Sequence, residues 1–201
     1  MFFAWGALME TKRKFNKEIF KEMILYISDR TADIPTFAST HLNKALHYSD
    51  FFSYATTGKS ISNETYIRQK FGQIPKHLVQ ARKELIDTEK LEIVEQNYFG
   101  KNQKRLKVKN NHSFELLTIE QKKIIDLIIQ QLAGFGASGV SEIAHQDLAW
   151  QYLENGEEIP YETVFFRRSN PVSRETMGWA ESVIDEYEAS GGDDDYAISG
   201  S

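Results

Sequence analysis

The chain has 201 residues, of which 41% are hydrophobic, 12% aromatic and 26% charged, with a formal net charge of −5. This apolar content suffices for a buried core and excludes wholesale disorder. The absence of cysteine excludes disulfides, zinc–thiolate and iron–sulfur sites and thiol nucleophiles, and it is typical of a cytoplasmic protein.

The charge is unevenly distributed along the chain. Residues 1–140 hold 21 basic and 15 acidic side chains, a balance of +6, whereas residues 141–201 hold 3 basic and 14 acidic ones, a balance of −11. A chain of this kind can steer an oppositely charged partner, or it can fold back and neutralise itself. Composition does not choose between these two outcomes.

The first ten residues, MFFAWGALME, form a short apolar run without a basic residue before it. A signal peptide needs a basic region and a small-residue cleavage site, and a membrane span needs about 20 apolar residues. We therefore predict no membrane segment here and treat residues 1–14 as an N-terminal extension. A short apolar arm that docks on a partner is the alternative.

The first half of the chain is predicted to be mainly helical. The expected elements are a helix over 15–29, a helix from 36 to about 57, an irregular segment over 66–75 and a helix over 76–87. Thr36 is predicted to be the N-cap of the second helix, and Gly58 to end it in a left-handed conformation. Gly72 and Pro75 both disfavour a helix, which is why their segment is predicted to be irregular.

The second half begins with the one strand pair that the pattern supports. Alternating residues over 90–99 and 101–109 predict a hairpin that turns at Gly100. Thr118 and Gln121 form a capping box for a fourth helix, and Ser138 is predicted to cap a fifth that ends at His145. The remaining expected elements are a segment over 161–166, a helix over 174–187 and an acidic, mobile end over 191–201.

These elements predict a mainly α (α+β) fold, in which a compact helical domain of five to six helices carries one antiparallel β-hairpin. We expect one domain over 15–188, followed by a flexible acidic tail over 189–201.

The candidate chemical motifs have simpler structural interpretations. Residues 134–139, GFGASG, match GxGxxG, but a helix precedes them where a dinucleotide site requires a strand, so a loop between helix caps is favoured. His41, His47 and Asp50 do not have the spacing of a metal site, and polar packing is the favoured interpretation. His145 with Glu142 is an equally weak acid–base pair. We therefore predict no enzyme, no metal and no cofactor.

The second predicted strand carries a basic cluster of Lys101, Lys104, Arg105, Lys107 and Lys109. Such a cluster can contact phosphates, which makes a nucleic-acid-binding phage or prophage accessory protein the alternative function. Lysines also protect edge strands against pairing with other chains. We favour this protective role and do not expect nucleic acid as a partner, because nucleic-acid-binding domains are usually basic overall.

Several separated stretches resemble one family. They are Leu42–Ser62 (LNKALHYSDFFSYATTGKSIS), Thr65–Leu78 (TYIRQKFGQIPKHL) and Ser141–Phe165 (SEIAHQDLAWQYLENGEEIPYETVF), preceded by Phe15–Thr31 (FNKEIFKEMILYISDRT). In this order they resemble the Panacea domain, a bacterial and phage family that includes SocA-like antitoxins. The resemblance covers about 15–187.

The resemblance implies a helical domain with a small β element that acts as the antitoxin of a type II toxin–antitoxin pair. Such an antitoxin neutralises a cognate toxin protein by direct contact in the cytoplasm. Toxins that target translation, including small alarmone synthetase-like enzymes, are among the partners that it implies. An enzyme acting on a nucleotide remains a further alternative.

Two sets of residues follow from the resemblance. The positions that match the family's pattern, which we interpret as structural, are Lys44, Tyr48, Asp50, Gly72, Pro75, His145, Trp150, Pro160 and Tyr161. The aromatic candidates for the toxin interface are Tyr54, Tyr66, Phe71, Tyr98, Phe99 and Trp150. If the toxin is basic, the acidic second part of the chain can compete with its nucleic-acid substrate.

Overall fold

The computed structural model describes residues 13–98, 100–109 and 112–165. All of them belong to residues 1–166, the first of the two units into which the chain divides. The predicted extension (except residues 13 and 14), the predicted helix over 174–187 and the acidic end therefore lie outside the described residues, as do Phe99 and the side chain of Tyr98.

Two long helices open the described chain. α1 (Lys17–Arg30) begins at Asn16, whose side chain accepts from the amide of Ile19. α2 (Ser39–Thr57) ends at Gly58, which has φ +73 as predicted. The predicted cap at Thr36 was wrong: the helix begins three residues later, after Ala38, and no side chain caps it. Phe37 is instead buried in the core, so the segment before α2 serves packing.

The segment predicted to be irregular forms a second hairpin. β1 (Tyr66–Gln69) pairs antiparallel with β2 (Gly72–Pro75), from Tyr66 opposite Pro75 to Gln69 opposite Gly72. Residues 156–159 extend it, because the amide of Ile159 donates to the carbonyl of Tyr66 and that of Arg68 to Glu157. Pro75 is accommodated because it lies at the end of the strand.

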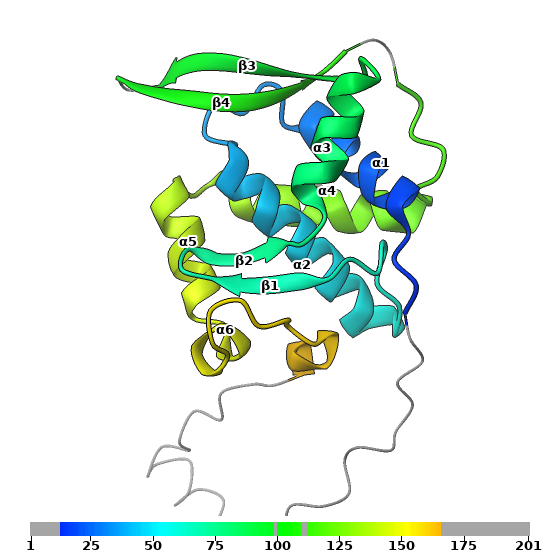
Figure 1. Ribbon diagram of the computed structural model, residues 1–201, viewed down its shortest axis with the longest axis vertical. Helices are drawn as coiled ribbons and strands as arrows, with labels where there is room; N and C mark the ends of the chain where they lie inside the picture. Colours follow the sequence, from blue (N-terminus) through cyan, green and yellow to red (C-terminus); the bar gives the residue numbers. More distant parts are fainter. Residues whose placement is uncertain (1–12, 99, 110–111, 166–201) are drawn as a thin grey trace, which may run out of the picture. The chain divides into compact units, whose positions relative to one another are not determined.

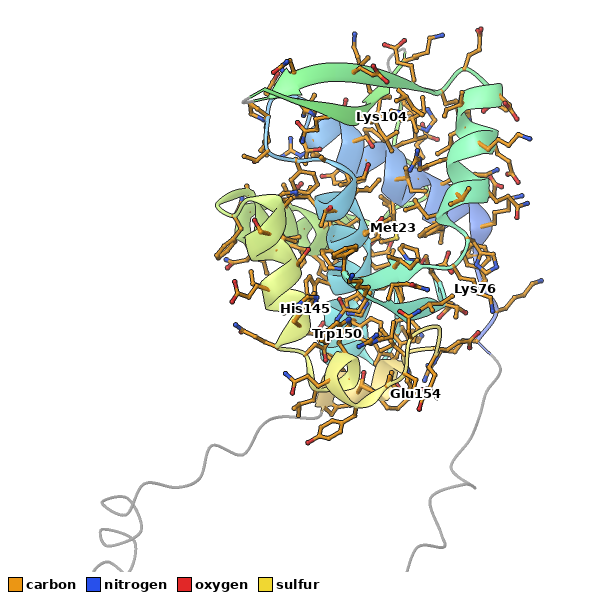
Figure 2. The ribbon with its side chains drawn as sticks, turned by 60° about the vertical axis from the view of Figure 1, so that its left-hand side comes forward. Met23, Lys76, Lys104, His145, Trp150 and Glu154 are labelled. Carbon is orange, nitrogen blue, oxygen red and sulfur yellow. The ribbon has the colours of Figure 1, made fainter. Side chains whose placement is uncertain are left out.

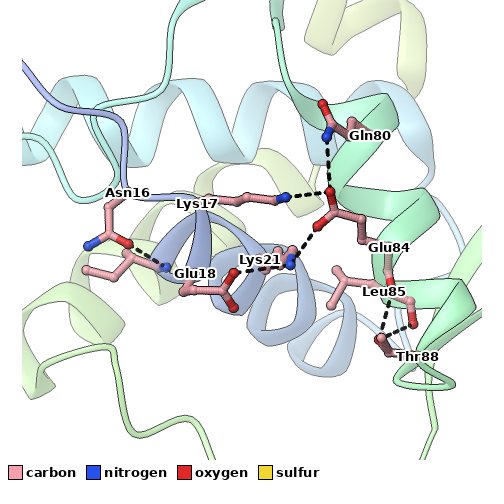
Figure 3. Close-up of polar contacts among 9 residues, drawn as sticks. Asn16, Lys17, Glu18, Lys21, Gln80, Glu84, Leu85 and Thr88 are labelled. Carbon is pink, nitrogen blue, oxygen red and sulfur yellow. Dashed lines mark hydrogen bonds and ion pairs between the residues drawn. The ribbon is translucent and has the colours of Figure 1, made fainter.

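The predicted hairpin is confirmed. β3 (Leu91–Tyr98) pairs antiparallel with β4 (Lys101–Val108), and Gly100 in the turn has φ +74. Between the hairpins lies α3 (Leu78–Asp87). Figure 3 shows how α3 is fixed to α1: Glu84 pairs with Lys17 and, at 2.7 Å, with Lys21. These two ammonium groups lower the pKa of Glu84 to about 2.

The remaining described elements are helical. α4 (Ile119–Ala133) starts with the predicted capping box of Thr118 and Gln121. α5 (Ala137–His145), α6 (Leu148–Tyr152) and a 3₁₀ helix, η1 (Tyr161–Phe165), follow. Gly136 rather than Ser138 is the N-cap residue of α5, and it makes no side-chain cap.

α2 is the central element, as Figure 1 shows: it contacts α1, α4, α5, β2 and η1. The described residues contain six α-helices and two hairpins, which confirms the mainly α (α+β) class and adds one hairpin to the prediction. No single helix in the described ranges is long and apolar enough to cross a membrane; α4 and α5 meet that test only together, across a bend of 111°.

Candidate functional site

A buried lysine lies in the middle of α2. Lys44 is 1% exposed, and its Nζ donates to the carbonyl oxygens of Phe71 at 3.1 Å and Gln73 at 3.0 Å. Burial lowers the pKa of Lys44 to about 8. The lysine therefore fixes the turn between β1 and β2 to α2 through carbonyl groups of the backbone.

Gly72 allows this approach. It has φ +103, and a Cβ placed on it would lie 2.2 Å from Lys44 Nζ and 2.9 Å from Ala144 Cβ. Both the backbone conformation and the space require glycine at this position. The family-pattern residues Lys44 and Gly72 are thus two parts of one contact.

A second polar group joins α2, β2 and the start of α6. Gln73 Nε2 donates to Asp147 Oδ2 at 3.0 Å, and Asp147 Oδ1 caps α6 by accepting from the amide of Ala149 at 3.1 Å. His47 Nε2 lies 3.8 Å from the same Oδ2. Complete burial lowers the pKa of His47, which keeps its ring neutral at pH 7.

A third polar group lies one turn further along α2. Asp50 is 0% exposed and accepts from the amide of Ser62 at 2.8 Å, from Ser62 Oγ at 2.6 Å and from the Tyr66 hydroxyl at 2.8 Å. Burial raises the pKa of Asp50, while these hydrogen bonds oppose the rise. The hydroxyl of Tyr161 donates to the carbonyl of Glu64 at 2.8 Å, so η1 is attached to the same region.

These contacts support a structural role for the family-pattern residues on α2. Lys44, His47 and Asp50 are at most 1% exposed, so a substrate does not reach them in this conformation. Within residues 13–98, 100–109 and 112–165, no group of three or more His, Asp or Glu side chains lies together in a way that could hold a metal ion. The polar groups of these three residues connect segments that are distant in sequence.

The turn that Lys44 holds carries an exposed aromatic residue. Phe71 is 68% exposed, and Lys70 Nζ lies 5.5 Å from the centre of its ring. Trp150 Nε1 donates to the carbonyl of Gln69 at 2.8 Å, just before the turn. We call the exposed part of this turn, Lys70 and Phe71, the hairpin tip.

Trp150 also joins β1 to the end of α5. Its ring stacks on His145 at 3.9 Å, and the guanidinium of Arg68 lies 4.4 Å from its centre. Figure 2 shows His145 and Trp150 next to each other. The structure thus pairs His145 with Trp150 by ring stacking.

The other predicted positions fall in different environments. Tyr54 is half-buried and donates to Glu162 at 3.0 Å. Tyr66 is 0% exposed, so it belongs to the core and cannot be an accessible anchor in this conformation. The predicted anchor Phe99 and the side chain of Tyr98 lie outside what the structure describes. The remaining family-pattern residues are Tyr48, whose ring packs on His47 at 5.1 Å, Pro75, which is buried, and Pro160, which is exposed.

Three members of the basic cluster on β4 make contacts within the protein, while the side chain of Lys101 lies outside what the structure describes. Lys104 lies 3.8 Å from Glu95 and Lys107 lies 3.6 Å from Glu92, both across the hairpin. Arg105 donates to the carbonyl of Thr31 at 2.6 Å. These contacts agree with the protective interpretation of the lysines better than with a row of phosphate contacts.

Part of the charge asymmetry is neutralised inside the fold. Glu158 pairs with Lys76 at 2.8 Å, and Glu162 pairs with Arg13. Two acidic residues of the second part of the chain therefore contact basic residues of the first part.

Residues 134–136 of the GxGxxG match connect two helices, and residues 137–139 form the first turn of α5. Gly134 is the C-cap residue of α4 and Gly136 the N-cap residue of α5. Nearby, His41 is buried and its Nε2 hydrogen-bonds to the carbonyl of Phe135 at 2.9 Å. A helix therefore precedes the match, as predicted, where a dinucleotide fingerprint has a strand.

Sequence reasoning missed three residues that organise this region: Arg68, Gln73 and Asp147. Asp147 carried a usable signal, since an aspartate before the short run LAWQY is a typical N-cap. Arg68 and Gln73 gave no such signal, because their partners lie more than 70 residues away in sequence.

Comparison with known proteins identifies the family. The model of the family described as "Antitoxin SocA-like, Panacea domain" matches residues 42–151, which include α2 from Leu42 onward, both hairpins and α6 up to Gln151. No curated protein and no solved structure matches the chain. Because the match spans more than half of the chain, this protein belongs to the SocA-like antitoxin family that is defined by the Panacea domain.

Proposed function

We propose that this protein is the antitoxin of a type II toxin–antitoxin system and that it neutralises a cognate toxin protein by direct contact. Membership of the SocA-like antitoxin family is the observation that carries the proposal. The matched region includes the buried polar contacts of α2 and the exposed hairpin tip, so the family pattern covers both a scaffold and an accessible surface.

We infer that neutralisation works by occupancy and requires neither a reaction nor a cofactor. Lys44, His47 and Asp50, the titratable residues of α2 that match or neighbour the family pattern, are engaged in holding the fold. A protein that blocks another needs a stable surface with a few well-placed anchors. We place its action in the cytoplasm, and toxins of translation, including small alarmone synthetase-like enzymes, are the first class to test.

The experiment is expression of this chain together with the product of the neighbouring gene. We expect the neighbouring product alone to arrest growth, co-expression to restore it, and the two proteins to elute together on gel filtration. Growth that stays arrested, with two separate elution peaks, would refute the proposal. Binding to generic DNA or RNA at low salt would favour the nucleic-acid alternative instead.

A further inference from the structure

The hairpin tip presents an aromatic side chain without a packing partner that would cover it. Phe71 is 68% exposed although its backbone belongs to a tight two-residue turn. Burying a phenylalanine side chain on association is favourable, because it removes apolar surface from water. A large aromatic residue on a fixed turn is therefore a candidate anchor for another protein.

The tip is held by contacts on both sides of the turn. Trp150 holds the carbonyl of Gln69 before it, and Lys44 holds the carbonyls of Phe71 and Gln73 within and after it. Gly72 adds a backbone conformation that the close contact with Lys44 requires. These bonds order the turn before any partner arrives, which reduces the entropy lost on binding.

Two other exposed apolar side chains are weaker candidates. Val79 is 79% exposed, but it is a small aliphatic side chain on α3. Phe165 is 59% exposed, but it is the last described residue. The hairpin tip combines exposure, a fixed backbone and a cationic neighbour, since Lys70 is exposed beside Phe71.

We propose that the hairpin tip is the anchor of the toxin interface and that Phe71 inserts into an apolar pocket of the toxin, with Lys70 facing a carboxylate at the mouth of that pocket. This inference rests on the proposed function and specifies its surface. The occupant is the toxin of the proposed function, to which the antitoxin family match points; an exposed aromatic ring beside an ammonium group is complementary to an apolar pocket with an acidic rim. Lys44 is a positioning residue, which acts on binding through the tip.

The first test measures the affinity of the full-length chain for the co-expressed toxin. Phe71→Ala and Lys70→Glu should each weaken binding at least 10-fold. The matched controls are Val79→Ala, which shortens an equally exposed apolar side chain, and Lys59→Glu, which reverses an exposed charge next to the end of α2. Both controls should bind within 2-fold of the wild type. Thermal unfolding of each variant checks that the fold is intact.

The outcomes separate the two proposals. A wild-type complex with unchanged affinity in Phe71→Ala and Lys70→Glu would overturn the assignment of the tip and leave the antitoxin function intact. If the wild type forms no complex and does not restore growth, the proposed antitoxin function is refuted, and the proposed interface is refuted with it.

A second test asks whether Lys44 acts through Phe71. Lys44→Met should speed amide hydrogen exchange in the turn and weaken toxin binding about 10-fold, but it should add little in the Phe71→Ala background. Equal losses in both backgrounds would show that Lys44 affects binding independently of the tip. Unchanged binding in Lys44→Met would show that the tip does not need this support.

Discussion

The contact between Gly72 and Lys44 makes a specific prediction for Gly72→Ala. At φ +103 an alanine backbone is strained, which costs about 1–3 kcal/mol. The new methyl group would also lie 2.2 Å from Lys44 Nζ and 2.9 Å from Ala144 Cβ, and crowding of this kind costs about 1–3 kcal/mol. The lower entropy of the unfolded alanine chain returns about 0.4–1 kcal/mol. Together these terms lower the free energy of unfolding by about 1–6 kcal/mol, with a central value of about 3 kcal/mol.

Urea unfolding followed by circular dichroism measures this loss, and Gly58→Ala is the matched control. Gly58 also has a positive φ, +73, but nothing lies within 4 Å of its added Cβ. Gly58→Ala should lower the free energy of unfolding by only about 1 kcal/mol, because only the backbone conformation is strained. Shortening Lys44 to alanine should recover part of the loss in the Gly72→Ala background. If Gly72→Ala costs no more than Gly58→Ala, the close packing of Lys44 against the turn is wrong.

Three further predictions concern the buried groups of α2. Asp50→Asn replaces one acceptor oxygen with an NH2 group that faces the donors of Ser62 or Tyr66, so we expect the free energy of unfolding in urea to fall by about 2–4 kcal/mol; an unchanged midpoint would contradict the three hydrogen bonds. Because the pKa of Lys44 falls to about 8 in the folded state, the unfolded state holds more protons above pH 8, and stability should rise from pH 8 toward pH 10 relative to Lys44→Met. If the stability of the wild type and that of Lys44→Met change in the same way with pH, the lowered pKa of Lys44 is contradicted. The lowered pKa of His47 has a similar consequence in acid: the unfolded state takes up the proton first, so stability should fall as the pH drops below about 6.5, and less so in His47→Gln.

Local signals in the sequence were enough to predict most helices and one hairpin. The capping box of Thr118 with Gln121 and the left-handed Gly58 depend on neighbouring residues only, and both are present. The β3–β4 hairpin was predictable because its strands are eight residues long and turn at a glycine. Such features need no information from distant parts of the chain.

The β1–β2 hairpin could not be predicted in the same way. Its strands have four residues each, and Gly72 and Pro75 argue against regular structure when read alone. What stabilises it is distant in sequence: Lys44 on one side and residues 156–159 on the other. The same holds for the candidate site, where the exposure of Phe71 and the burial of Tyr66 depend on packing that periodicity does not report.

The contacts of α2 have a consequence for synthesis on the ribosome. The contact between Asp50 and Ser62 can form soon after Ser62 is synthesised. The contacts of His47 and Gln73 require Asp147, and the contact of the Glu64 carbonyl requires Tyr161. At about 5–20 residues per second, the roughly 100 residues between these partners take about 5–20 s to translate. During that interval His47 on the central helix lacks its partner, so the nascent protein completes this part of its core only after Asp147 and Tyr161 have been translated.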